Sequence, residues 1–212
     1  MDINTPFGCT FPILILIHER SCFATQQDWT TSILSFLPLL DEYPCFLLQI
    51  RNKTPLAKEE ATHLLSLLPF HSRIIINIPS IEICSFARHR TEKELGLLGI
   101  SASIHSIEKA QQYQTQYQFM HFGPVFEPIS KVSEARGLDA LSKLSKEVQI
   151  PIIAVGGITE QNIRQILDLS VAGVGIIGSI LQSKEPLITT KKFLNMIQDY
   201  IEIKKTIRKS PK

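Results

Sequence analysis

The chain has 212 residues, of which 44% are hydrophobic and 20% are charged, so it can bury a large core and is too apolar for a disordered protein. Its formal net charge is +2, but five basic residues lie within 204–212 and leave −3 for the rest. A weakly acidic body lacks the clustered basic surface that nucleic acid binding requires, so we expect no nucleic acid partner. We expect a single domain over 1–203 and a solvated basic tail over 204–212.

The cysteines and the N-terminal segment indicate a reducing, non-membrane environment. The four cysteines are widely spaced and include no CxxC pair, which favours reduced thiols over zinc ligands or disulfides. The start of the chain has no basic segment, and the apolar stretch 11–17 is too short for a signal core or for the ~20 residues of a membrane span. We therefore expect a cytoplasmic protein with no membrane contact.

Short apolar runs alternate with longer amphipathic stretches along the whole chain. Strands are expected over 11–17, 45–50, 73–77, 100–104, 119–123, 151–155 and 174–177. Helices are expected over 28–40, 55–68, 106–116, 138–148, 159–169 and 185–203. This alternation predicts right-handed parallel βα units in a single-domain α/β protein, a TIM (β/α)8 barrel near the lower end of its usual size. An open, doubly wound sheet is the alternative fold.

The fourth unit of such a barrel is compressed. Only 22 residues separate Asn77 from Ile100, where a helix, a strand and another helix would normally lie. The stretch 81–86 alternates like a strand, but it follows Asn77 too closely for a full crossover of roughly a dozen residues. We therefore predict a shortened or missing fourth βα unit and leave the position of its strand open.

Polar residues at the carboxyl ends of the strands are the first candidates for a site, because the reactive face of these barrels is built from the loops that follow the strands. Gln49 and Arg51 alternate with Ile50 and so point to one face, and a buried arginine calls for an anion. Further candidates follow the third, fifth and sixth strands: Asn77, Ser103, Ser130 and Lys131.

Glycine turns follow the last two strands. Gly156 with Gly157, and Gly178 before Ser179, leave backbone N–H groups that can meet an anion. Turns after the seventh and eighth strands are the usual phosphate site of these barrels. With Arg51, Lys53 and Lys131 on other loops, they predict a site for more than one phosphate group.

Several of these segments, taken in order, resemble one family. QIRNK at 49–53, IIIN at 74–77, SIHS at 103–106, FGPVFEPISK at 122–131, PIIAVGGIT at 151–159 and GVGIIGSI at 173–180 are similar to the motifs of thiamine phosphate synthase and its relative thiazole tautomerase. The set in this order is specific, whereas each member alone is weak.

The resemblance implies a reaction and a set of residues. It implies that hydroxymethylpyrimidine diphosphate loses its diphosphate and that the thiazole nitrogen then attacks the stabilised cation, giving thiamine phosphate. It implies that the pyrimidine diphosphate is bound by Gln49, Arg51, Lys53, Asn77, Ser103 and Lys131, of which Arg51, Lys53 and Lys131 would be catalytic. It implies that the thiazole phosphate is bound by 128–130 with Ser130, and by Gly156, Gly157, Ile177 and Gly178.

The chain departs from the family pattern at the metal site. The resemblance implies Mg²⁺, but Ile78 replaces the family's first Asp ligand and the segment that carries the second is lacking, so the metal ligands are unknown. Pro128 likewise replaces a family threonine. Thiazole tautomerase needs no metal, but Pro124 stands at its catalytic histidine, which leaves His121 as a candidate general base. A synthase, a tautomerase-like enzyme and a non-catalytic paralogue that binds a phosphorylated ligand remain open, as does the oligomeric state.

Overall fold

The computed structural model describes residues 12–79, 81, 85–127, 134–169 and 171–209, and it shows a closed barrel of parallel strands. The strands follow one another around the barrel in chain order, and β1 closes it by pairing with β8. They are β1 (Ile13–Glu19), β2 (Phe46–Arg51), β3 (Ile74–Asn77), β4 (Ala87–Arg90), β5 (Ser101–Ile104), β6 (Phe119–Phe122), β7 (Ile152–Val155) and β8 (Gly173–Ile176). The predicted TIM barrel is confirmed, and the open sheet is wrong.

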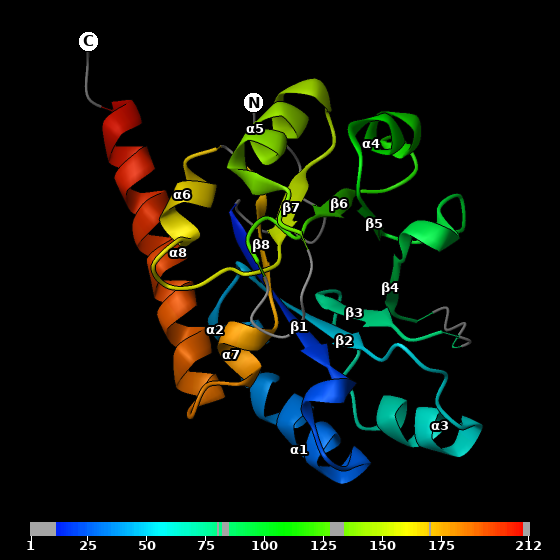
Figure 1. Ribbon diagram of the computed structural model, residues 1–212. Coiled ribbons are helices and arrows are strands. Elements are labelled where there is room, and N and C mark those ends of the chain that lie inside the picture. The colour runs from blue at the N-terminus through cyan, green and yellow to red at the C-terminus, as the bar shows by residue number, and fades with distance from the viewer. Residues whose placement is uncertain (1–11, 80, 82–84, 128–133, 170, 210–212) are drawn as a thin grey trace.

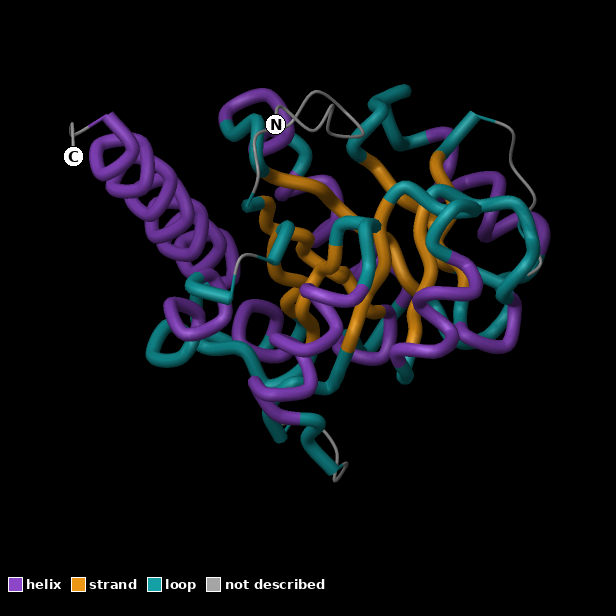
Figure 2. The backbone as a smooth tube through the Cα atoms, turned by 90° about the horizontal axis from the view of Figure 1, so that it is seen from above, coloured by secondary structure: helices purple, strands orange, loops and turns teal. Residues whose placement is uncertain are grey.

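Helices lie outside the strands, which gather in the middle of the molecule (Figure 2). They are α1 (Gln26–Phe36), α2 (Pro38–Glu42), α3 (Lys58–Ser66), α4 (Ile107–Tyr113), α5 (Gly137–Glu147), α6 (Ile163–Leu167), α7 (Gly178–Leu181) and α8 (Pro186–Lys209), with 3-10 helices η1 (Arg20–Cys22) and η2 (Glu92–Glu94). The long α8 runs down one side of the barrel (Figure 1) and continues beyond residue 203. The division of the chain at that residue stays a prediction.

The fourth βα unit is present but shortened. β4 pairs with β3 through Ile75 and Ala87, and with β5 through His89 and Ser101. Between β4 and β5 the described chain contains only the three-residue η2 in place of a helix. Of the alternating stretch 81–86, residues 82–84 lie outside the described part, and the strand itself begins at Ala87. The prediction of a shortened unit is therefore confirmed, and the pairing with both neighbours places its strand.

Alternation along the strands separates an inner from an outer apolar layer. Inward residues such as Ile15, Leu47 and Phe119 fill the amino end of the barrel. Outward residues such as Leu16 pack with helical side chains, including Trp29 of α1. Because successive strand residues point to opposite sides, the next inward positions toward the carboxyl ends also face the barrel interior. On β2, β3 and β6 these positions are the polar Gln49, Asn77 and His121, whereas β7 has Val155.

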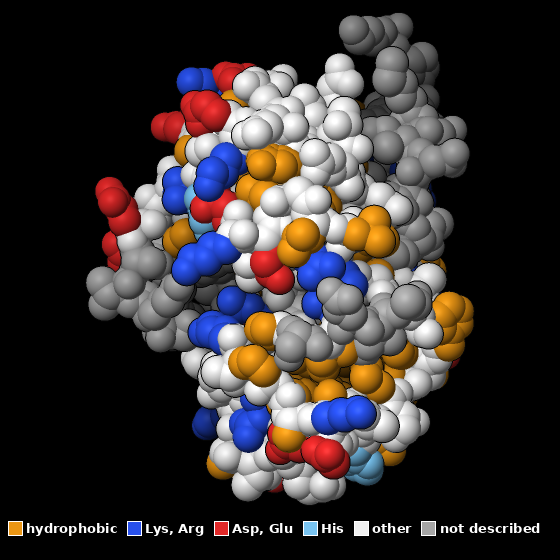
Figure 3. Space-filling view, turned by 90° about the vertical axis from the view of Figure 1, so that its right-hand side faces the viewer, with side chains coloured by type: hydrophobic (Ala, Val, Ile, Leu, Met, Phe, Trp, Pro, Cys, Tyr) orange, Lys and Arg blue, Asp and Glu red, His pale blue; other side chains and the backbone are white. Residues whose placement is uncertain are grey.

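The surface carries both charged and apolar side chains. Seen from the right-hand side of Figure 1, Lys and Arg side chains gather across the middle of the molecule, with apolar side chains exposed around them (Figure 3). No helix in the described ranges is long and apolar enough to cross a membrane. Cys45 is buried and Cys22 partly buried, and neither forms a disulfide among the described residues, whereas Cys9 and Cys84 lie outside them.

Candidate active site at the carboxyl end of the barrel

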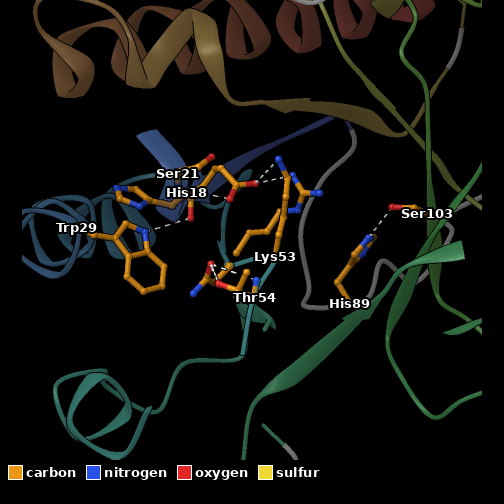
Figure 4. Close-up of polar contacts among 10 residues, drawn as sticks. His18, Ser21, Trp29, Lys53, Thr54, His89 and Ser103 are labelled. Carbon is orange, nitrogen blue, oxygen red and sulfur yellow. Dashed lines mark hydrogen bonds and ion pairs between the residues drawn. The ribbon is translucent and has the colours of Figure 1, made fainter. Parts of the chain in front are cut away.

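Three inward side chains at the ends of β1, β2 and β3 stand in one row of the sheet. Glu19 pairs in register with Arg51, and Arg51 with Asn77. Arg51 Nη1 donates to Glu19 Oε2 at 2.6 Å, and Lys53 Nζ lies 4.0 Å from the same oxygen (Figure 4). Glu19 is buried, Arg51 is partly exposed and Lys53 is exposed. One carboxylate therefore holds two cations at the barrel mouth, and the group keeps a net positive charge.

Gln49 lies one inward position below Arg51 on β2. Its side chain is buried, and its Oε1 has no hydrogen-bond partner among the described residues. A buried amide oxygen without a donor costs about 1 to 3 kcal/mol, so native proteins usually satisfy such groups with a ligand or a water molecule. The orphaned oxygen therefore indicates a donor supplied from outside the described chain at this level of the barrel.

The side of the site formed by β4, β5 and β6 contains neutral hydrogen-bonding groups. His89 Nδ1 lies 2.8 Å from Ser101 Oγ, and His89 Nε2 lies 2.8 Å from Ser103 Oγ. The His121 ring packs against His89 with ring centroids 4.4 Å apart and ring planes tilted by 35°, and His121 pairs with Ser103 in the sheet. Four inward side chains from three strands thus form one packed group.

Both histidines of this group are uncharged near neutral pH. Burial lowers the pKa of His121 to about 3, with a further contribution from the charge of Arg51. Burial also holds the pKa of His89 well below 6.5, and His121 and Arg51 add to the effect. The buried Nε2 of His121 has no partner among the described residues. A base with so low a pKa is poorly matched to proton abstraction at neutral pH, so His121 does not suit the role of general base.

The glycine turns after β7 and β8 lie side by side. Gly156 and Gly157 have φ values of +93° and +63°, and a Cβ on Gly157 would lie 2.6 Å from the backbone oxygen of Glu127. Ser179 of the second turn donates its hydroxyl to the carbonyl of Ile158, directly after the first turn. This hydrogen bond joins the two turns, as expected for neighbouring strands.

A model of the family "Thiamine monophosphate synthase" matches residues 87–180, from β4 to α7. A thiamine-phosphate synthase from Koribacter versatilis is 26% identical over 209 residues, covering 90% of this chain and 98% of its own length. The chain is therefore similar to the thiamine monophosphate synthase family over its second half, and to one thiamine-phosphate synthase over nearly its whole length. A thiamine-phosphate synthase from Archaeoglobus fulgidus is 27% identical over 107 residues, and the match spans about half the length of that relative.

Solved structures share the barrel fold of this chain. Thiamine phosphate pyrophosphorylase from Pyrococcus furiosus superposes with a TM-score of 0.64 at 18% identity, covering 89% of this chain and 96% of that one. A geranylgeranylglyceryl phosphate synthase from Thermoplasma acidophilum gives 0.65 at 11% identity, covering 90% and 94%. At such identities the likeness shows the barrel fold alone, which serves more than one reaction.

The structure brings together most of the residues that the family resemblance implies. Gln49, Arg51, Asn77 and Ser103 all occupy inward strand positions, and Lys53 lies at the mouth beside Glu19. The glycine turns with Gly156, Gly157, Ile177 and Gly178 lie at the ends of the neighbouring strands β7 and β8. Pro128, Ser130 and Lys131 lie outside the described residues. The roles of all these residues stay predictions.

Sequence reasoning missed Glu19, His89 and Ser101. Glu19 ends the first apolar strand, so the strand-end rule that selected Arg51 could have found it. His89 belongs to the strand whose position was left open, and its partner Ser101 opens the next strand. No local signal joins His89 to Ser101, because only strand pairing places them together.

The position that the family resemblance assigns to the first magnesium ligand has no oxygen donor in the described structure. Ile78, directly after Asn77, is buried in the outer apolar layer and offers no oxygen ligand. No group of three or more His, Cys, Asp or Glu side chains in the described ranges could hold a metal ion. Octahedral Mg²⁺ in proteins is usually bound through one or two carboxylates together with substrate phosphates. Within the described residues, the cationic side chains beside Glu19 at the barrel mouth are Arg51 and Lys53.

Proposed function

We propose that the chain is a thiamine phosphate synthase, which joins hydroxymethylpyrimidine diphosphate to thiazole phosphate and releases diphosphate. One observation carries the proposal. Gln49, Arg51, Asn77 and Ser103, which the family resemblance assigns to the pyrimidine diphosphate, converge on the barrel interior from three strands. Their convergence supports a binding role, because polar side chains that face the same part of the barrel interior can contact one ligand together.

The charges of the site suit the bond that breaks. The C–O bond between the pyrimidine methylene and the diphosphate breaks, the electron pair leaves with the diphosphate, and the thiazole nitrogen lone pair forms the new C–N bond. Arg51 and Lys53 stabilise the charge that develops on the leaving oxygens. Among the described residues the side-chain bond of Arg51 is to Glu19, so other guanidinium N–H groups are available for phosphoryl oxygens. Lys131 is the proposed third cation.

The two glycine turns form the proposed site for the thiazole phosphate, and a matched pair of variants tests it. An alanine at Gly157 would place its Cβ 2.6 Å from Glu127 O, whereas Gly137, with φ +81°, has open space around its Cβ position. Both substitutions carry the left-handed backbone penalty of roughly 1 to 2 kcal/mol, and only Gly157→Ala also disrupts the turn. We expect calorimetry to show loss of thiazole phosphate binding in Gly157→Ala alone. Equal affinity in the two variants contradicts the assignment.

A binding paralogue for the same phosphorylated ligands is the second candidate. Ile78 favours it, because the family's metal ligand is replaced by a buried aliphatic side chain. Neither position considered for the base of a tautomerase-like enzyme suits that role, since Pro124 stands at the family's histidine and the pKa of His121 is about 3. In each case the proposed partners are small phosphorylated molecules in the cytoplasm.

A single assay separates the candidates. The protein is incubated with both precursors, with and without Mg²⁺, and thiamine phosphate is measured by chromatography. The synthase is supported if the wild-type chain makes thiamine phosphate and Arg51→Met makes less of it. Lys143→Met, on the exposed face of α5, is the control and should make as much product as the wild type. Binding of the diphosphate precursor without product under any metal condition supports the binding paralogue. Product that is unaffected by Arg51→Met contradicts the proposed role of this residue.

A further inference from the structure

The hydroxyl of Ser101 has one side-chain partner inside the barrel. Ser101 is fully buried, and its Oγ lies 2.8 Å from His89 Nδ1. A buried hydroxyl hydrogen without an acceptor costs about 1 to 3 kcal/mol, so the Ser101 O–H donates to this nitrogen. His89 Nδ1 is therefore the acceptor nitrogen of the ring.

The protonation state of the His89 ring then determines whether Nε2 donates or accepts a hydrogen bond. His89 is buried, and the neighbouring His121 and the charge of Arg51 both oppose a second positive charge there, so the ring is neutral. A neutral imidazole has one N–H and one acceptor nitrogen. Because Nδ1 accepts, Nε2 carries the hydrogen and donates to Ser103 Oγ across 2.8 Å (Figure 4).

Ser103 is the end of this chain of hydrogen bonds. Its Oγ accepts from His89, so its own O–H is left to point elsewhere, and no other side-chain bond of Ser103 is found among the described residues. Ser103 is only partly buried and points inward on β5 beside His121 of β6. The opposite tautomer would use the Ser103 hydrogen on His89 and present only oxygen lone pairs to an incoming anion.

We propose that His89 is a positioning residue that fixes the Ser103 hydroxyl as a hydrogen-bond donor to a phosphoryl oxygen of the bound diphosphate. The inference rests on the proposed function for the identity of the ligand, but the direction of the hydrogen bonds follows from the buried geometry alone. The hydrogen bond from Ser101 determines which ring nitrogen of His89 carries the hydrogen. That nitrogen donates to Ser103, and Ser103 contacts the ligand. A neutral donor of this kind adds no charge to the inner part of the barrel, where an ion would be costly.

Nitrogen NMR of the 212-residue protein tests the direction of the hydrogen bonds from Ser101 through His89 to Ser103 without any ligand. In a ¹⁵N-histidine-labelled sample at neutral pH, the His89 signals are assigned by their loss in His89→Gln. We expect Nε2 to carry the proton and Nδ1 to show the shift of an unprotonated ring nitrogen. A proton on Nδ1, or on both nitrogens, overturns the inference.

Binding of inorganic diphosphate, measured by calorimetry, tests the consequence. We expect Ser103→Ala and His89→Leu each to weaken binding roughly tenfold to hundredfold, the usual value of one hydrogen bond to a charged group. His89→Gln keeps an amide N–H and should recover most of the affinity. The exposed His63→Gln on α3 is the matched control and should bind like the wild type.

A double-mutant cycle separates positioning from general structural damage. If His89 acts through Ser103, the double variant His89→Leu/Ser103→Ala binds diphosphate no more weakly than Ser103→Ala alone. Additive losses, or a His89→Gln variant as weak as His89→Leu, overturn the inference. A wild-type chain that does not bind diphosphate contradicts the proposed function and the ligand named here, whereas the NMR result still decides the hydrogen-bond direction.

Discussion

The two sides of the candidate site solve the problem of burying polar groups in opposite ways. The charged half consists of Glu19, Arg51 and Lys53 and lies at the barrel mouth, where Arg51 and Lys53 remain partly or fully exposed. The neutral half, His89, Ser101, Ser103 and His121, lies deeper and carries no ion at neutral pH. The charged groups lie where water can reach them, and the more buried positions carry neutral hydrogen-bonding groups, of which Ser103 remains partly exposed.

The halves are nevertheless coupled. The charge of Arg51 helps to lower the pKa of both His89 and His121 across the barrel. Under the proposed function Arg51 has two roles, since it attracts the ligand's phosphates and adds to the burial that keeps the facing imidazoles neutral. The comparison predicts that changes in the charged half should affect stability and affinity together, whereas acid should affect the neutral half first.

The largest expected effect is that of Arg51→Met. The substitution leaves the buried Glu19 carboxylate with the Ser21 N–H at 3.5 Å and with Lys53 Nζ 4.0 Å away, so we expect a loss of about 3 kcal/mol in the free energy of unfolding in urea. Glu19→Gln in the same chain should restore most of this stability, because no unpaired charge then remains. If the double variant is no more stable than Arg51→Met, the charged half does not depend on this ion pair.

Acid should destabilise the fold through its buried histidines. The pKa of His121 is about 3 in the folded chain and 6.5 when unfolded, so its contribution is complete above pH 6.5 and decreases as the pH falls toward 3. At pH 5 each such histidine lowers the free energy of unfolding by about 2 kcal/mol. His18, which also has a pKa of about 3, makes a second contribution of this size. Urea unfolding from pH 7 to 4 should show a shallower pH slope for His121→Phe than for wild type or His63→Gln. An unchanged slope would mean that His121 is not buried as described.

The smallest expected effect is on salt dependence, and it distinguishes the halves most directly. Added NaCl should weaken binding of inorganic diphosphate, because exposed charges are screened beyond roughly 8 to 10 Å at physiological ionic strength. Ser103→Ala should bind more weakly with the same dependence on salt, since it loses a neutral donor. Arg51→Met should show a reduced dependence. Calorimetry at three salt concentrations measures both, and equal slopes in all three proteins would contradict the division into a charged and a neutral half.

Local patterns in the sequence determined the barrel fold and several of the residues that line the candidate site. Apolar runs of strand length, separated by amphipathic helices, required a parallel sheet buried on both faces, and the alternation around Ile50 placed Gln49 and Arg51 on one side of β2. The glycine pair 156–157 likewise indicated a turn with positive φ. These features depend on neighbours within a few residues, so the sequence alone was sufficient for them.

Only the tertiary structure decided which of these side chains meet. β4 is too short and too polar to be recognised by its own pattern, and its position follows from its pairing with β3 and β5. The bond between Glu19 and Arg51 joins residues 32 apart in the chain, and strand register, not local sequence, brings them together. The same holds for His89 between Ser101 and Ser103, because a hydrogen-bonded network across strands exists only when the barrel has closed.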